Sequence, residues 1–441
     1  MSFDRLIARW KIRRFVGFAD KIIYHVYEIV DKTVNIMYNP FIKYEQKESE
    51  AIHMTKLYSL LIAIITFILP FLNIPEFNPD KDNEKTQYVN VFVHGLSGWG
   101  SYDLADKAMP YWGMSNGNLM TYLSARGFDS RSASVTATAS AWDRACELYA
   151  QLTGTRTDYG KEHSERCGHR RYGKSYKGRA LLDNWDGENK INLFGHSFGG
   201  ATVRTLTSLM AYGSEAERAS TDPNEISGLF TGGKADFIYS VTTLAAPHNG
   251  TSAYIIKDMI FSDKEATAAE ISTATLLTIA SMPIKDGRDE DDSAEHNMYI
   301  DNAAELNKEI KTVDSVYYFS YACDNSEQQA DGTYAPKKDT TEALFIPCSA
   351  RVGKYVGQTK GGITVDESWR RNDGLVNTVS ALYPSGAPHT DFDRNDVRTG
   401  IWNVMPIYNG DHMSLQGGMT VKNEDVKLFY ANHIDMINSL G

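Results

Sequence analysis

The sequence has few cysteines, and this scarcity excludes one class of protein. Four cysteines in 441 residues are too few for a disulfide framework, and none lies in a CxxC pair. Cys323 and Cys348 flank a polar loop and could form a disulfide if the domain is exported. Two buried thiols are the favoured interpretation.

The chain also lacks an excess of positive charge. It has 45 lysines and arginines against 56 acidic residues, a formal net charge of -11. The basic residues are scattered, without the stripe that would follow a phosphate backbone. The sequence therefore argues against nucleic acid as a partner, and it leaves the oligomeric state open.

One long apolar run is present near the N-terminus. Residues 57–72 read LYSLLIAIITFILPFL, without a charge, which is typical of a segment that enters a bilayer. The preceding stretch is richer in lysine and arginine than the acidic linker that follows, so the positive-inside rule places the following domain outside. We expect a membrane anchor or signal segment at 54–75 and a linker at 76–87.

Two interpretations of this segment remain open. It is either an anchor that stays in the membrane or a secretory signal that begins at Met54, because Met-Thr-Lys before an apolar core is typical of such signals. The lack of a small-x-small cleavage site after Leu72 favours the anchor. The protein is then membrane-anchored, or secreted if the segment is cleaved. Residues 1–53 are expected to form an amphipathic helix or a poorly structured tail.

From Tyr88 onward, short β-rich runs alternate with helical stretches. The runs 88–93, 190–194, 237–244 and 316–321 are typical of buried strands, and the intervals between them are long enough for crossover helices. The sequence therefore predicts an α/β domain over 88–441, with a mostly parallel sheet and helices on both faces. The acidic run 286–295 is expected to be a solvated loop.

A G-x-S-x-G motif, Gly195 to Gly199, stands between a predicted strand and a predicted helix. A sharp turn there forces Ser197 into a strained backbone conformation, and the flanking glycines avoid collisions. The hydroxyl would stand at a helix N-terminus whose amides favour an oxyanion. We expect Ser197 to be a nucleophile, with the backbone amides of Leu96 and Phe198 as the oxyanion hole.

The motif predicts an acid and then a base downstream of the serine. Asp373 lies in a glycine turn beside apolar residues, and His412 lies in a short polar loop. We expect them to be the orienting acid and the base. The rivals are Asp366, Asp391 and Asp411 for the acid, and His389 and His433 for the base.

Several segments together resemble one known family, the bacterial true lipases of staphylococci and thermophilic bacilli. The similar segments, in the same order, are VHGLSGWG (93–100), residues 142–178, GHSFGG (195–200), LAAPHNGTS (244–252), RNDGLVNTVS (371–380) and WNVMPIYNGDH (402–412). The resemblance covers about 89–430. It implies an α/β-hydrolase fold, a Ser197, Asp373 and His412 triad, and hydrolysis of lipid esters at a membrane or lipid-droplet surface.

The resemblance leaves rival functions open. A triacylglycerol lipase is the expected function, and a carboxylesterase or phospholipase of the same fold is the nearest alternative. A non-catalytic, membrane-tethered binding protein is the rival from another class.

The resemblance also implies a structural zinc site in an insertion at about 142–178. Asp143, His163 and His169 match three of the family's four ligands, and two imidazoles with two carboxylates would close a tetrahedron. The fourth ligand is less well marked: Asp286 is our choice, with Asp289 next. The family's calcium site uses acidic residues soon after the histidine, but residues 413–419 have none, so we do not predict calcium.

An apolar insertion at about 251–296 contains two stretches with many large apolar residues, 254–261 and 276–282. Such a composition fits a mobile lid that opens on a lipid surface. An ordinary helical cap is the alternative.

Overall fold

The computed structural model describes residues 87–282 and 289–440. The predicted N-terminal segments, 1–53 and 54–75, and nearly all of the linker lie outside the described residues. Within the described ranges, no helix has the length and apolar character needed to span a bilayer.

A seven-stranded parallel sheet forms the centre of the domain. Its order is β13-β14-β7-β6-β5-β1-β2, and every neighbouring pair is parallel. The strands are β1 Val89–Val93, β2 Ser130–Ala133, β5 Ile191–His196, β6 Ile238–Leu244, β7 Tyr317–Tyr321, β13 His389–Asp391 and β14 Trp402–Val404. The four strands predicted from the sequence are β1, β5, β6 and β7, and the prediction of a parallel sheet is confirmed.

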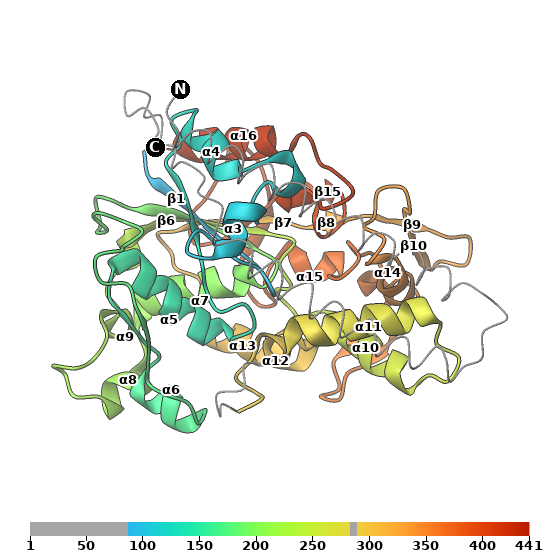
Figure 1. Cartoon of the computed structure of the whole chain (residues 1–441), viewed down its shortest axis with the longest axis horizontal. Coiled ribbons are helices and arrows are strands. Elements are labelled where there is room, and N and C mark those ends of the chain that lie inside the picture. Colours follow the sequence, from blue (N-terminus) through green and yellow to red (C-terminus); the bar gives the residue numbers. More distant parts are fainter. Residues whose placement is uncertain (1–86, 283–288, 441) are drawn as a thin grey trace, which may run out of the picture. The chain divides into compact units, whose positions relative to one another are not determined.

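Helices cover both faces of this sheet, as predicted (Figure 1). Alternate residues of a strand point to opposite faces, so Val91 and Val93 join one core cluster while Phe92 joins another. The first cluster packs against α5 (Ala141–Thr153) and α7 (Gly199–Tyr212), and the second against α4 (Leu119–Ser124) and α16 (Val426–Asn438). The two core clusters pack against opposite faces of the sheet. They hold the end of β5, directly before Ser197, in a fixed position.

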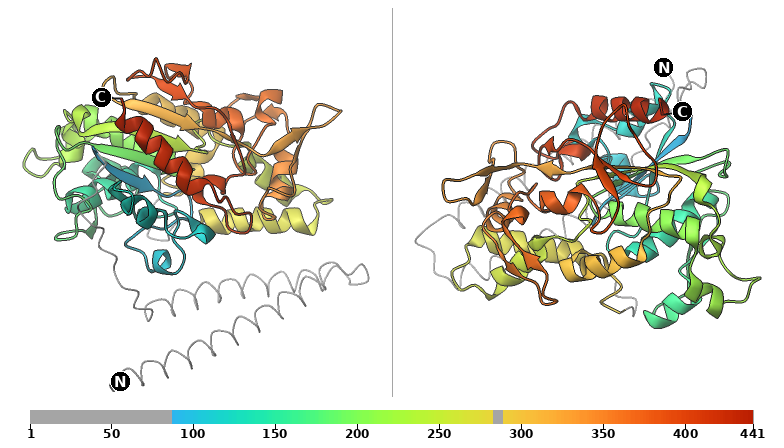
Figure 2. Two further views of the ribbon diagram at one scale, coloured as in Figure 1. Left: turned by 90° about the horizontal axis from the view of Figure 1, so that it is seen from above. Right: turned by 180° about the vertical axis from the view of Figure 1, so that it is seen from behind.

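Two insertions extend from this core. The first continues from α5 through β3 (Arg156–Asp158), α6 (Lys161–Arg166) and β4 (Tyr172–Ser175). The second contains α10 (Ser252–Ser262) and α11 (Ala268–Ser281), followed by α12 (Ala294–Met298) and α13 (Ile300–Glu309). Figures 1 and 2 show α6 toward one end of the domain and the α10–α11 pair toward the other.

The remaining elements are short. They are α3 Leu104–Ala108, α8 Glu215–Ser220, α9 Gly228–Thr231, α14 Ile346–Val352, α15 Thr378–Leu382, β8 Cys323–Asp324, β9 Ser326–Gln328, β10 Tyr334–Pro336, β11 Gly357–Gln358, β12 Thr364–Val365 and β15 Tyr408–Asn409. All four cysteines are buried free thiols, so the interpretation of Cys323 and Cys348 as buried thiols is confirmed.

Candidate active site

Ser197 lies in the sharp turn between β5 and α7. Its φ is +53°, in the left-handed region that non-glycine residues rarely adopt. A Cβ on Gly195 would come within 2.5 Å of the Gly199 carbonyl oxygen, and one on Gly199 within 2.3 Å of the Val93 oxygen. Both glycines are therefore required by close backbone approach, and the predicted strained turn is present.

His412 lies between Ser197 and Asp373. Its Nε2 is 2.9 Å from the Ser197 Oγ, and its Nδ1 is 2.8 Å from Asp373 Oδ2. With Nδ1–H donating to the carboxylate, Nε2 carries the lone pair that accepts from the serine hydroxyl. The structure therefore brings together three residues that the sequence separates by up to 215 positions.

The carboxylate of Asp373 is fixed by its own turn. Its Oδ1 accepts hydrogen bonds from the amides of Leu375 and Val376, at 3.0 and 2.8 Å. The His412 amide donates to the Asp373 carbonyl at 2.8 Å. Backbone and side chain thus hold the two residues in register, which orients the imidazole toward the serine.

The electrostatic environment of His412 favours a proton on the ring. Burial lowers the pKa of His412, but the negative charge of Asp373 and its hydrogen bond outweigh burial, so the pKa lies above its ordinary value. An imidazole in this environment is a stronger base than a free one, and the imidazolium formed by proton transfer is stabilised.

A hydrogen-bonded chain connects the His412 loop to the loop after β1. His196 donates from Nε2 to the His412 carbonyl at 2.9 Å, which leaves its Nδ1 to accept from the Tyr111 hydroxyl at 2.8 Å. That hydroxyl accepts from the Gly95 amide at 2.9 Å. Burial lowers the pKa of His196 well below its usual value, so this neutral tautomer persists and the chain holds both loops.

Two backbone amides beside Ser197 are available as donors. Within the described chain, the amides of Leu96 and Phe198 donate no hydrogen bond. The carbonyl and amide of a trans peptide point in opposite directions. Arg144 lies 3.4 Å from the Gly95 carbonyl oxygen, and the Gly200 amide donates to the Ser197 carbonyl at 2.9 Å. The carbonyls of Gly95 and Ser197 are thus held by other groups of the protein. The amides of Leu96 and Phe198, on the same two peptides, point in the opposite direction and stay available for an oxyanion.

The rival acids and bases lie elsewhere. Asp411 accepts from the Glu342 amide at 2.7 Å and the Ser414 hydroxyl at 3.0 Å, and it does not contact the imidazole through a hydrogen bond. His433 is bonded to Thr242 and Tyr321. The other rivals, Asp366, Asp391 and His389, are exposed.

An apolar pocket of about 230 Å³ opens above Ser197 and His412. Helix α11 forms one wall through Leu276, Leu277 and Ala280. The Ser97 hydroxyl donates to the Ala280 carbonyl at 2.5 Å, which joins α11 to the loop that carries Leu96. The second insertion therefore covers the pocket, as the sequence predicted for a lid or cap.

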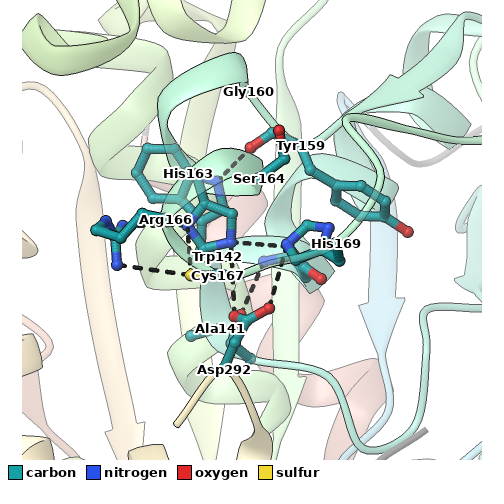
Figure 3. Close-up of polar contacts among 12 residues, drawn as sticks. Ala141, Trp142, Tyr159, Gly160, His163, Ser164, Arg166, Cys167, His169 and Asp292 are labelled. Carbon is teal, nitrogen blue, oxygen red and sulfur yellow. Dashed lines mark hydrogen bonds and ion pairs between the residues drawn. The ribbon is translucent and has the colours of Figure 1, made fainter. Parts of the chain in front are cut away.

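A second polar cluster lies where α5 and the first insertion meet the segment before α12 (Figure 3). Asp143 of α5, His163 of α6, His169 and Asp292 place one ligand atom each within 4.8 Å of one another. His163 Nε2 is 3.2 Å from Asp143 Oδ1 and 3.5 Å from Asp292 Oδ1. His169 Nε2 is 3.3 Å from Asp292 Oδ2 and 3.8 Å from Asp143 Oδ1.

These separations fit a metal ion. Four ligand atoms about 2.1 Å from a tetrahedral ion are about 3.4 Å from one another. His169 Nδ1 lies 3.0 Å from the Arg170 carbonyl, to which it can only donate, so Nε2 keeps its lone pair for a metal. Burial lowers the pKa of His163, but Asp143 and Asp292 raise it to about 11, so the cluster favours a positive charge at its centre.

The fourth residue of the described cluster is not one of the two that the sequence singled out. Asp286 lies outside the described residues, and Asp289, the next choice, is exposed. Asp292 completes the described cluster and is only 4% exposed. The expectation that 286–295 is a solvated loop is therefore wrong at Asp292. Its position before the N-cap Ser293 of α12 turns its carboxylate inward toward α5.

Sequence reasoning missed two residues of these sites. His196 is the variable residue of the G-x-S-x-G motif, so the motif alone gave it no role. Asp292 is one of five acidic residues between 286 and 292, and no spacing within that run distinguishes it.

Comparisons with known proteins agree with this geometry. The sequence model of the family described as "Lipase-like, C-terminal domain" matches residues 86–265 and 285–439. A lipase of Staphylococcus hyicus is 31% identical over 369 residues, which are 78% of this chain and 56% of that protein. The chain thus spans about half the length of the curated relatives it matches.

Solved structures with the same fold are also similar. EstA from Clostridium botulinum has a TM-score of 0.69 and 30% identity, covering 84% of this chain and 92% of that one. The Staphylococcus hyicus lipase structure has a TM-score of 0.68 and 28% identity, covering 82% and 98%. The predicted α/β-hydrolase fold is confirmed.

Proposed function

Since the chain belongs to the bacterial lipase family that includes the staphylococcal enzymes, we propose that it hydrolyses carboxylic esters of lipids, with Ser197 as the nucleophile. One observation carries this proposal: the His412 ring lies 2.9 Å from the Ser197 hydroxyl and 2.8 Å from the Asp373 carboxylate. That arrangement converts a weak nucleophile into a strong one, because a base removes its proton during attack.

The proposed reaction is acyl transfer through the enzyme. His412 Nε2 accepts the proton of the Ser197 hydroxyl as Oγ attacks the ester carbonyl carbon, and the same proton passes to the departing alcohol. The amides of Leu96 and Phe198 donate to the oxyanion. Water, deprotonated by His412, then attacks the acyl-enzyme carbonyl carbon. The bond to Ser197 Oγ breaks, the carboxylic acid leaves, and the proton on His412 returns to Ser197. Asp373 holds the ring and stabilises the imidazolium.

The pocket supports an apolar acyl group as substrate. Its walls are largely aliphatic and aromatic, including Leu277, Phe345 and Val376. Three large apolar residues near α11 face solvent: Ile271 and Ile279 are 40% exposed and Met282 is 52% exposed. An exposed apolar surface on a helix that covers the pocket suits contact with a lipid phase, so we propose that α11 is a lid.

A chain-length series tests the substrate. Initial rates are measured on soluble short-chain esters and on emulsified long-chain triacylglycerol, with Ser197→Ala as the control. A lipase hydrolyses the emulsion, whereas a carboxylesterase prefers the soluble esters. Hydrolysis that persists in Ser197→Ala at the wild-type rate would contradict the proposed nucleophile, because its removal should lower kcat roughly 10⁶-fold.

We propose that the metal held by Asp143, His163, His169 and Asp292 is zinc. Two imidazoles and two carboxylates suit this ion, and a four-ligand set leaves no position for a reacting water. A bound zinc would supply a structural link between α5, α6 and the segment before α12. The catalytic steps above use none of these four residues.

We propose further that residues 54–75 attach the enzyme to a membrane, with the catalytic domain outside. The charge-free run and the basic residues before it support this placement. Fractionation of cells tests it: the chain should sediment with membranes, and a Leu61→Asp/Ile65→Asp variant should be released. Equal sedimentation of both would contradict the anchor.

A further inference from the structure

A second cavity, of about 630 Å³, is separate from the pocket above Ser197 and shares no lining residue with it. It is bounded by residues of α7, by the C-terminal part of α13 and by β14. Its lining includes Arg204, Asn307, Lys308, Lys311, Tyr318 and Trp402. None of these residues takes part in the proposed hydrolysis or the metal cluster.

Arg204 is a buried cation at this cavity. It is only 4% exposed, and its guanidinium donates to Asn307 Oδ1 at 2.7 Å and to His248 Nδ1 at 3.3 Å. Among the described residues, no carboxylate forms an ion pair with it. Burial lowers the pKa of Arg204 to about 10, so it stays charged at neutral pH. A buried charge without a counter-charge is unfavourable, and the cavity leaves room for one.

Trp402 and Tyr318 form an aromatic wall of the cavity. Trp402 is 1% exposed, and its ring packs against that of Tyr318, with centroids 5.0 Å apart. An aromatic wall beside a buried cation suits a ligand that has an apolar body and a charged group.

The charges at the solvent edge of the cavity are of both signs. Lys308 and Lys311 line the cavity and are exposed. Lys308 is 2.6 Å from Glu305, and Asp314 also lines the cavity. Asp314 is exposed and forms no ion pair with Arg204. The buried groups are therefore donors, whereas the acidic groups lie at the solvent edge.

We propose that this cavity is a second ligand site, which binds a small organic anion through its carboxylate or phosphate group. Arg204 pairs with the oxyanion. A guanidinium matches both of these planar or tetrahedral oxyanions. The rings of Trp402 and Tyr318 provide an apolar wall for the body of the ligand, and the volume is within the range of small-molecule sites.

Isothermal titration of the full chain tests the site with three probes: hexanoate, inorganic phosphate and phenyl phosphate. The Ser197→Ala protein is used throughout, so that the result does not depend on hydrolysis. The test variant is Lys308→Ala/Lys311→Ala, and the matched control is Lys177→Ala/Lys360→Ala, which removes the same charge from exposed positions outside the cavity lining.

We expect at least one probe to bind with millimolar affinity or better. Removal of Lys308 and Lys311 should weaken it roughly fivefold, while the control pair leaves it unchanged. Arg204→Gln should weaken it at least about tenfold, and if that variant does not fold, the lysine pair decides. Binding of hexanoate alone identifies a carboxylate ligand, and binding of the phosphates alone a phosphate ligand. No binding at about 10 mM, or equal weakening in test and control pairs, would overturn the proposal.

Discussion

The His412 imidazole is the residue whose charge state controls the proposed reaction. It accepts a proton from Ser197 only when neutral, and Asp373 raises its pKa above the ordinary value of 6.5. The rate therefore falls as pH drops through a value above 6.5. The pH dependence of kcat/KM reports this pKa in the free enzyme.

Asp373→Asn should change the pH dependence of kcat/KM that His412 controls. The substitution removes the largest influence that raises the pKa of His412, so the acidic limb of the kcat/KM profile should move to lower pH. The rate should also fall roughly 10⁴-fold, because the imidazole loses its orienting acceptor. Asp366→Asn, an exposed rival, is the control and should change neither quantity. An unmoved limb in Asp373→Asn would contradict the assignment of the acid.

At the scale of residues, the sequence singles out Ser197, Asp373 and His412, which the structure brings into contact, because their local chemistry is distinctive. Ser197 is marked by glycines that the turn requires, and Asp373 and His412 by their surroundings and by the resemblance. Asp292 could not be identified as a metal ligand from the sequence, because the run 286–295 contains several acidic residues in similar surroundings. Only the tertiary structure shows that Asp292 is buried.

At the scale of elements, α11 combines polar contacts with little apolar burial. A capping box at Thr267 and Glu270 fixes its N-terminus, and Arg351 contacts Asp263 and Glu270. Near its C-terminus, the Ala280 carbonyl accepts from the Ser97 hydroxyl. Its buried residues are only Thr273, Ala274 and Ser281, and a helix that buries little apolar surface suits the local opening that we propose for a lid.

The exposed apolar residues of α11 should matter for activity on a lipid phase. Ile271→Ser/Ile279→Ser should lower activity on emulsified long-chain esters by roughly tenfold, because less apolar surface is available to contact the lipid. Activity on soluble short-chain esters should change less than about twofold. Leu428→Ser on α16, where the side chain is 54% exposed, is the control. Equal loss on both substrates would indicate an ordinary cap.

The loop that follows His412 depends on Glu342. Its Oε1 accepts from the amides of Met419, Thr420 and Val421 at 2.7, 2.8 and 3.1 Å, and its own amide donates to Asp411. Glu342→Ala should lower the free energy of unfolding by about 3 kcal/mol and reduce kcat, because the amides of residues 419–421, in the loop that follows His412, lose their carboxylate acceptor. Denaturant unfolding and initial rates measure the two effects. Glu367→Ala, at an exposed position, should alter neither, and wild-type kcat in Glu342→Ala would contradict the positioning role.

The interior strands were predictable and several short ones were not. β5 and β6 are buried at every position, and their sequences INLFGH and IYSVTTL are rich in apolar and β-branched residues. β2, β13 and β14 have three or four residues each, with the sequences SRSA, HTD and WNV. Too short for a periodic pattern, they become strands only because the sheet provides a partner.

At the scale of the whole molecule, the metal cluster joins distant parts of the chain. β5, β6 and the helices around them lie between Asp143 and Asp292 in the sequence, yet both carboxylates contact His163. A bound ion would therefore stabilise the folded state relative to the unfolded chain. The predicted three ligands came from a resemblance, whereas the fourth required the tertiary structure.

Metal analysis of the purified protein tests the cluster. Asp292→Ala should lose the zinc and lower the Tm by roughly 5 °C or more, and a chelator should lower the wild-type Tm in the same way. Asp289→Ala is a matched control three residues away, and it should keep both metal and Tm. Equal zinc in wild type and Asp292→Ala would contradict the ligand assignment.

The proposed hydrolysis depends on an activated serine, and labelling by a fluorophosphonate probe measures that activation most directly. The probe reacts with a serine only where a base and an oxyanion hole act on it. We expect labelling of the wild-type protein and of Ser97→Ala, a neighbouring serine that also has a positive φ, and no labelling of Ser197→Ala. A wild-type protein that is not labelled, or a Ser197→Ala protein that still is, would contradict the proposed nucleophile.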